Sequence, residues 1–241
     1  MEDQADSAQE DRVNMRSKGQ QARSRERVEQ VPNAAESLVV ESGMEGLKMR
    51  ELARRAGLPI ASLYHYFPSS SSVVRALAVR HLDSMREVLR TGLPEIMQPQ
   101  PDAEARARNG GRLVARIARY LLATPASAAI WDSLRATPEL RQLDMEDTAR
   151  HARELEPYLQ WVAPTIAPEV IPSLTIVLLE AVQANLIVIM HSPKTVQATL
   201  TDAAVAMITA TLRGFQVMGD FKGSDAVPPA GSTKRHGDHR P

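Results

Sequence analysis

The side chains best suited to chemistry in this sequence are cations and hydrogen-bonding groups between residues 47 and 70. Lys48 and Arg50 precede a segment rich in hydroxyl, phenol and imidazole groups. Cations and helix N-terminal amides bind phosphate oxygens, whereas base edges are read by side chains that enter a groove. We expect a surface for double-stranded DNA made by Lys48, Arg50, Ile60, Ala61, Ser62, Tyr64, His65, Tyr66, Ser69 and Ser70.

A second polar group, Asp147, His151 and Glu154, has a spacing that places three potential metal ligands on one helical face. One helix alone seldom completes a metal site, so a solvated charged face is the expected interpretation. The sequence also has no P-loop, nucleophile elbow or HExxH motif. We therefore expect no cofactor, no metal and no enzyme activity, and keep a metal-dependent sensor or enzyme as the rival that chelator-removable metal would favour.

Two short amphipathic helices must position the DNA-contact residues. The apolar residues of the first recur at helical spacing: Met49, Leu52, Ala53 and Ala56. Gly57 follows where a helix often ends in a left-handed residue, and Pro59 suits the first turn of the next helix. The second segment places Leu63 and Phe67 on one buried face. This pattern predicts a helix-turn-helix whose second helix enters the major groove.

The stretch Leu52–Ser69, LARRAGLPIASLYHYFPS, resembles the recognition region of the TetR family of bacterial transcriptional regulators. Residues 33–43, NAAESLVVESG, also resemble the first helix of that family. Together the resemblance covers residues 31 to about 77. Beyond it, the chain agrees with the family only in length and helical pattern, which is an analogy at the level of fold.

The resemblance implies an all-α fold of about nine helices, with an N-terminal three-helix helix-turn-helix DNA-binding domain and a larger C-terminal helical bundle for ligand binding and dimerisation. It also implies a repressor that binds a palindromic operator as a homodimer and is released by a small, largely apolar effector. Pro59 replaces a capping hydroxyl, and Ser70 stands where the family usually has a lysine. A dimeric helical ligand-binding or scaffold protein with weakened or lost DNA binding stays open as the alternative.

Composition sets the class of protein. The chain has 241 residues, 43% of them hydrophobic, no cysteine and a formal net charge of zero. Residues 12–75, which include the helix-turn-helix, nevertheless carry eleven Lys or Arg against six Glu. The acidic first residues are unlike a signal peptide, and polar residues interrupt the apolar stretch 170–190. We expect a cytoplasmic protein without a membrane span.

Periodicity and helix breakers predict the domain limits. We expect a disordered arm over 1–26, the DNA-binding domain over 27–72, the ligand-binding and dimerisation domain over 73–218 and a disordered tail over 219–241. The helix after Ser69 is expected to end at Gly92 and Pro94. The next is expected over 112–123, because Asn109, Gly110 and Gly111 interrupt its pattern.

Two further sets of residues follow from the helical patterns. Aromatic, histidine and methionine side chains suit an apolar effector pocket: Tyr120, Trp131, His151, Tyr158, Trp161 and Met190. The last two helices, near 169–191 and 194–218, have apolar residues on more than one face and are expected to pair with a second chain as a four-helix bundle. The expected dimer residues are Leu174, Leu178, Ala181, Asn185, Val188, Leu200, Ala204, Met207 and Ile208.

Overall fold

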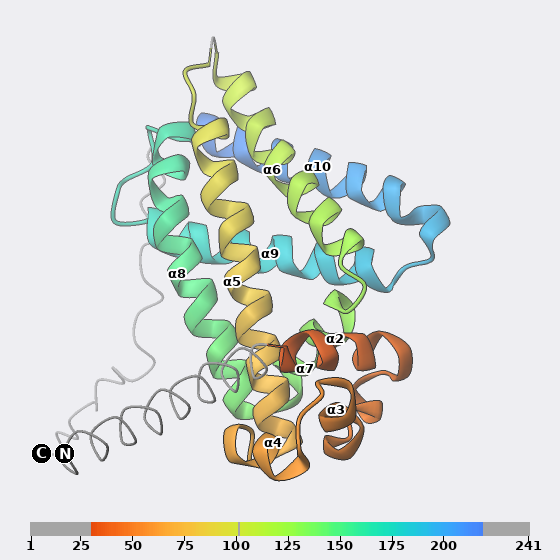
Figure 1. Ribbon diagram of the computed structural model, residues 1–241. Helices are drawn as coiled ribbons and strands as arrows, with labels where there is room; N and C mark the ends of the chain where they lie inside the picture. The colour runs from red at the N-terminus through yellow and green to blue at the C-terminus, as the bar shows by residue number, and fades with distance from the viewer. Residues whose placement is uncertain (1–29, 101, 219–241) are drawn as a thin grey trace, which may run out of the picture.

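The computed structural model describes residues 30–100 and 102–218, which form nine α-helices and one short 3-10 helix (Figure 1). No strand occurs within these ranges. The all-α prediction is confirmed. The predicted arm over 1–26 and tail over 219–241 lie outside the described residues.

The first three helices form the helix-turn-helix unit. They are α2 (Val31–Ser42), α3 (Met49–Arg55) and α4 (Ile60–Tyr66), with the 3-10 helix η1 (Met44–Gly46) between the first two. Gly43 and Gly57 have φ angles of 68° and 63°, in the left-handed region that a side chain disfavours. Gly57 therefore follows the end of α3 in the way that the sequence predicted, and Gly43 ends α2 in the same way. Pro59 lies one residue outside α4, at its N-cap.

Helix α5 (Ser70–Ile96) begins at a capping box, in which Ser69 and Ser72 each accept a hydrogen bond from the other's backbone amide. The expected end at Gly92 and Pro94 was wrong, because α5 continues to Ile96. A Cβ at Gly92 would lie 2.8 Å from the Leu113 side chain, so this glycine marks close packing against α6. The Met97 amide still donates to the Leu93 carbonyl, which completes the last turn after Pro94.

Helix α6 (Ala103–Ala123) is continuous, so the expected start at Arg112 was also wrong. Its two central glycines lie where α10 (Lys194–Val217) crosses it closely. A Cβ at Gly110 would lie 2.4 Å from Leu212, and one at Gly111 would lie 2.4 Å from Thr209. Tertiary packing therefore requires these glycines inside a helix, although glycine by itself disfavours one.

The remaining helices are α7 (Ser127–Ala136), α8 (Pro138–Val162) and α9 (Ile171–His191). The chain turns by 98° between α6 and α7. Thr137 caps α8 by accepting a hydrogen bond from the Leu140 amide at 3.3 Å. In Figure 1, α5 runs between α6 and α8, while α9 and α10 cross behind them. The helix-turn-helix unit lies at one end of α5.

Helix α5 takes part in all three apolar cores of the described chain. Val73 and Leu77 pack in the helix-turn-helix core, which also contains Ile130 from α7. Leu82 packs in a small cluster with α7 and α8, and Leu89 lies in the large core. The domain boundary that we predicted between 72 and 73 falls inside this helix. The two parts are thus joined by one continuous helix.

The middle of α8 differs from the solvated face that the sequence suggested. Asp144, Asp147 and His151 are all buried. Asp147 accepts a hydrogen bond at 2.9 Å from Arg86 of α5 and lies 3.3 Å from the His151 ring. Within the described residues, no group of three or more His, Asp or Glu side chains is arranged to hold a metal ion.

Helix α9 is long and apolar enough to cross a membrane, judged by length and composition alone. Only 22% of its most apolar 18-residue window is buried within the chain. Such a helix needs cover on a second face.

Candidate functional site

The DNA-contact residues that the sequence predicted lie on α4 and the segments beside it, and nearly all of their side chains are exposed. Leu63 is fully buried, so it fixes the orientation of α4 on the helix-turn-helix core. Ile60, Tyr64 and Tyr66 are 40%, 48% and 41% exposed. Ser62 is only half-buried. A seven-residue helix held by one leucine therefore presents its aromatic and hydroxyl groups to solvent.

The basic groups of α3 divide into two sets. Arg54 forms an ion pair with Glu51, and Arg55 is paired with both Glu51 and Glu41. These guanidinium groups lower the pKa of Glu51 to about 2. By contrast, Lys48 and Arg50 are exposed and form no ion pair with any described residue. Their charges remain available to an external anion.

The N-terminus of α5 adds two serines to the same region. The Ser69 hydroxyl oxygen accepts from the Ser72 amide at 3.2 Å, so its hydrogen remains able to donate. Ser70 is exposed in the first turn.

One cation on α5 ties this unit to the long helix. The Arg80 guanidinium forms an ion pair with Glu36 and a hydrogen bond with Asn33, both on α2. Its Nη2 also lies 3.4 Å from the Pro32 carbonyl oxygen. These contacts fix the orientation of α2 relative to α5.

The large core contains an apolar cavity of about 60 Å³ between α5, α6, α8, α9 and α10. Of the six predicted effector residues, only Tyr158 lines it. Its phenol donates to the Arg106 carbonyl at 2.8 Å, and burial raises its pKa. The other walls are almost all aliphatic: Leu89, Gly110, Leu113, Val114, Ile117, Leu155, Leu159, Thr175, Leu178, Leu179, Val182, Ile208 and Leu212.

The other five predicted effector residues lie elsewhere. Trp131 packs edge-on against His81, with 5.8 Å between the ring centroids. Trp161 stacks with the Arg106 guanidinium, whose carbon lies 5.4 Å from the ring centroid. His151 is the partner of Asp147, while Tyr120 and Met190 pack partly buried against the large core. The aromatic residues did not locate the cavity, because its walls are mostly leucines and other aliphatic residues, which occur throughout the sequence.

Several buried polar side-chain atoms have no hydrogen-bond partner in the described structure. They include the Nε2 atoms of His81 and His151, the Nε1 atom of Trp131 and Oε1 of Gln183. Burial lowers the pKa of His81 to about 4 and also lowers that of His151. Both imidazoles are therefore neutral at pH 7, and each has hydrogen-bonding capacity left for water or a polar ligand.

A hollow of about 370 Å³ lies beside the apolar cavity, and Leu113 lines both. Three guanidinium groups of α6, those of Arg112, Arg116 and Arg119, surround it. Arg116 is neutralised by Glu95 at 2.9 Å, so the hollow keeps a positive excess.

The predicted dimer residues divide between an exposed face and the interior. Val188 and Met207 are 55% and 43% exposed. Ala204 and Ile208 are buried in the chain's own core, and Leu178 lines the apolar cavity. The remaining ones are half-buried: Leu174, Ala181, Asn185 and Leu200. The α10 face that stays exposed instead carries the small residues Ala203, Ala206 and Ala210.

Sequence and structure comparisons give one consistent result. Residues 33–77 match the pattern that describes the bacterial regulatory proteins of the tetR family. Among curated proteins, none matches the chain.

Several solved structures share the fold. FadR from Bacillus subtilis, solved in complex with stearoyl-CoA, is 15% identical with a TM-score of 0.57, over 76% of this chain and 98% of that one. The TetR family regulator PfmR from Thermus thermophilus is 20% identical with a TM-score of 0.51, over 76% and 97%. A transcriptional regulator from Rhodococcus sp. Rha1 is 20% identical with a TM-score of 0.52, over 78% and 97%.

Proposed function

Since the chain belongs to the TetR family of bacterial transcriptional regulators, we propose that it is a cytoplasmic repressor that binds a palindromic operator as a homodimer. The observation that carries this proposal is the exposed α4, which lies beside two cations without ion-pair partners among the described residues, Lys48 and Arg50. Ser62 and the exposed Ile60 contact bases in the major groove, while the tyrosines and the serines of α5 contact phosphates.

The dimer forms through α9 and α10. Ile176, Val177 and Val188 form an exposed apolar surface on α9, and the small residues of α10 allow a second helix pair to approach closely. This explains why α9 is so apolar and yet so little buried within one chain. Two copies would form a four-helix bundle that sets the distance between the two α4 helices.

The effector is an apolar molecule that enters the cavity beside Tyr158. At about 60 Å³ the cavity is far smaller than most ligand pockets, so binding must enlarge it. Leu89 of α5 lines the cavity, and an enlarged cavity therefore displaces the helix that carries the DNA-reading unit. Effector binding thus lowers operator affinity only as far as the effector prefers the displaced state.

The adjoining arginine hollow refines the chemistry of the effector. An apolar chain in the cavity with an anionic head group beside Arg112 and Arg119 would use both spaces, which meet at Leu113. The similar FadR from Bacillus subtilis was solved with stearoyl-CoA, which has this amphipathic character. We therefore favour acyl anions over uncharged hydrocarbons as the first effector class to test.

Two arginine variants test the DNA surface by fluorescence anisotropy on a duplex from the gene's own upstream region. Arg50→Ala removes an unpaired cation from each protomer, so log K against log[salt] should become less steep by about 2. Arg54→Ala is the matched control, because Glu51 already neutralises that guanidinium. Equal effects of the two variants would contradict the placement of the DNA surface.

The alternative from sequence, a dimeric ligand-binding or scaffold protein without DNA binding, predicts a different result. Such a protein would remain a dimer and bind acyl anions, but would show the same weak affinity for upstream and scrambled duplexes. The missing lysine at Ser70 is the feature that favours this alternative.

A further inference from the structure

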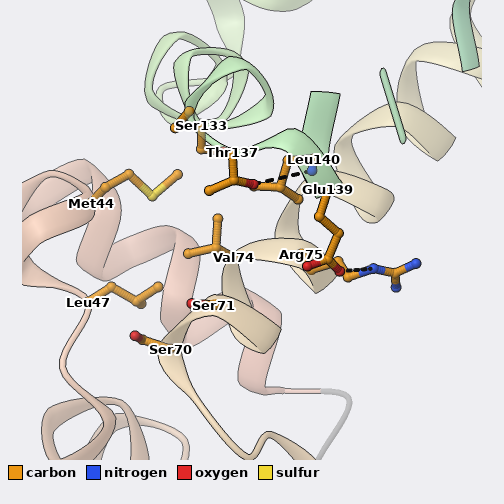
Figure 2. Close-up of a pocket in the computed structure, with 11 residues that line it drawn as sticks. Met44, Leu47, Ser70, Ser71, Val74, Arg75, Ser133, Thr137, Glu139 and Leu140 are labelled. Carbon is orange, nitrogen blue, oxygen red and sulfur yellow. Dashed lines mark hydrogen bonds and ion pairs between the residues drawn. The ribbon is translucent and has the colours of Figure 1, made fainter. Parts of the chain in front are cut away.

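A second hollow, of about 350 Å³, lies where three parts of the chain meet. One wall comes from Met44 and Leu47, which lead into α3, and another from Ser133 and Leu140 at the corner of α7 and α8. The first turns of α5 supply Val74 between them (Figure 2). The hollow shares no lining residue with the cavity in the large core.

Packing explains why space remains at this point. Leu47 is buried in the helix-turn-helix core, and Leu140 is buried in the small cluster of α5, α7 and α8. Val74 packs against both clusters. Two separately packed cores therefore meet at a single valine, and the hollow lies beside it.

The lining indicates the chemistry of a ligand. Five of its side chains are apolar, those of Met44, Leu47, Val74, Ala136 and Leu140, and Ser70 and Ser71 add hydroxyl groups at one side. The two charged groups at the rim neutralise each other, because Arg75 Nε lies 3.3 Å from Glu139 Oε1 (Figure 2). The hollow therefore offers no net charge to an ionic ligand. Its lining matches an apolar ligand with a single polar group.

We propose that this hollow binds an uncharged, largely apolar small molecule that carries one hydroxyl or carbonyl group. Its size lies at the lower end of small-molecule pockets, which span about 300–1,000 Å³. The ligand packs against Met44 and Val74 and exchanges a hydrogen bond with a serine of α5. This site takes a different class of compound from the acyl anion proposed for the large core.

Binding here is coupled to DNA, and this part rests on the proposed function. The walls come from both sides of the joint between the DNA-reading unit and the rest of the chain, so a ligand favours the relative orientation that keeps the hollow open. Ser70 is also a predicted phosphate contact. By linkage, operator DNA must change the ligand's affinity by the same factor as the ligand changes that of DNA.

The site is tested by calorimetric titration of the full chain, without DNA, with 2-naphthol as the probe and 2-naphthoate as its anionic counterpart. Ala136 and Ser71 are exposed and line the hollow, so Ala136→Trp and Ser71→Trp fill it without entering a core. Ala123→Trp, at the exposed end of α6, is the matched control. We expect 2-naphthol to bind at least tenfold more weakly to both filling variants than to wild type and the control, a difference of about 1.4 kcal/mol.

Three results would overturn the site: no binding of 2-naphthol by the folded chain, equal binding by wild type and both filling variants, or tighter binding of 2-naphthoate that these variants abolish. A second titration in the presence of upstream duplex tests the coupling alone. An unchanged 2-naphthol affinity with bound duplex would overturn the coupling. If no duplex binds specifically, the proposed function fails, whereas the titration without DNA still decides the site.

Discussion

The Arg80 guanidinium of α5 forms an ion pair with the Glu36 carboxylate of α2 and so ties the first helix of the DNA-reading unit to the long helix. Both side chains are about one-third exposed, so solvent screens part of the attraction. Arg80→Ala should lower the free energy of unfolding by about 1 kcal/mol, because Asn33 and Glu36 lose a shared partner. Urea denaturation measures this.

Arg90→Ala is the control for that experiment. Among the described residues Arg90 pairs only with Glu87, on the same helix, and both side chains are mostly exposed. Its loss should change the free energy of unfolding by less than about 0.5 kcal/mol. Equal effects of the two substitutions would show that the tie between α2 and α5 adds nothing.

The crossing of α6 and α10 predicts opposite effects for two glycine substitutions. In Gly110→Ala the new Cβ would lie 2.4 Å from Leu212 Cδ1 and 2.7 Å from the Tyr158 hydroxyl, and both neighbours are buried. Overpacking of this kind should cost about 1–3 kcal/mol. In Gly214→Ala the Cβ meets open space, so the helix should gain up to about 1 kcal/mol. Thermal unfolding of both variants measures the difference, and a stabilised Gly110→Ala would refute the close crossing.

The buried His81 predicts a loss of stability in acid. Burial lowers its folded pKa to about 4 from an ordinary value of 6.5, so between these values the unfolded chain binds more protons than the folded one. The free energy of unfolding is therefore highest above pH 6.5 and falls by up to about 3 kcal/mol as the pH falls to about 4.

His81→Gln should flatten this pH dependence of the free energy of unfolding, measured by urea denaturation from pH 7.5 to 4. Some slope should remain, because burial lowers the pKa of His151 in the same direction. If the variant kept the full wild-type pH dependence of the free energy of unfolding, the folded state would not disfavour protonation of His81.

Val177, which is 66% exposed on α9, provides a specific test of the proposed dimer. Val177→Glu would place an unpaired carboxylate in the four-helix bundle, which should cost about 3 kcal/mol or more and give monomers at micromolar concentration. Met145→Glu is the control, since Met145 is 63% exposed on α8, away from that face. Sedimentation velocity distinguishes the two. A dimer that survives Val177→Glu would place the interface elsewhere.

Local patterns predicted the helix-turn-helix well because its signals are local. Gly57 acts on its own neighbours, and its φ angle of 63° is the left-handed conformation that the sequence implied. The same local logic failed at Gly92, Gly110 and Gly111, which looked like helix breakers. Each of these glycines is required by a close contact with Leu113, Leu212 or Thr209. These partners lie far along the chain, so no pattern in a single sequence reveals the contact.

The apolar cavity and the exposed face of α10 were harder to predict for the same reason. The face of α10 that packs against α6 determines whether Ile208 or Met207 points outward. Both residues are apolar, so their hydrophobicity does not distinguish the two faces. The cavity walls are leucines and valines whose neighbours depend on five helices at once. The exposed face of α10 carries a run of small residues, Ala203, Ala206 and Ala210.

Hydroxyl-radical footprinting of the purified dimer on its upstream DNA, with a scrambled duplex beside it, tests whether two copies of α4 read a symmetric operator. We expect two protected patches related by two-fold symmetry, with centres about 34–36 Å apart on one face of the duplex. Addition of acyl anion should remove both together. A folded dimer that protects neither duplex, or protects both equally without symmetry, would show that α4 does not read a symmetric operator.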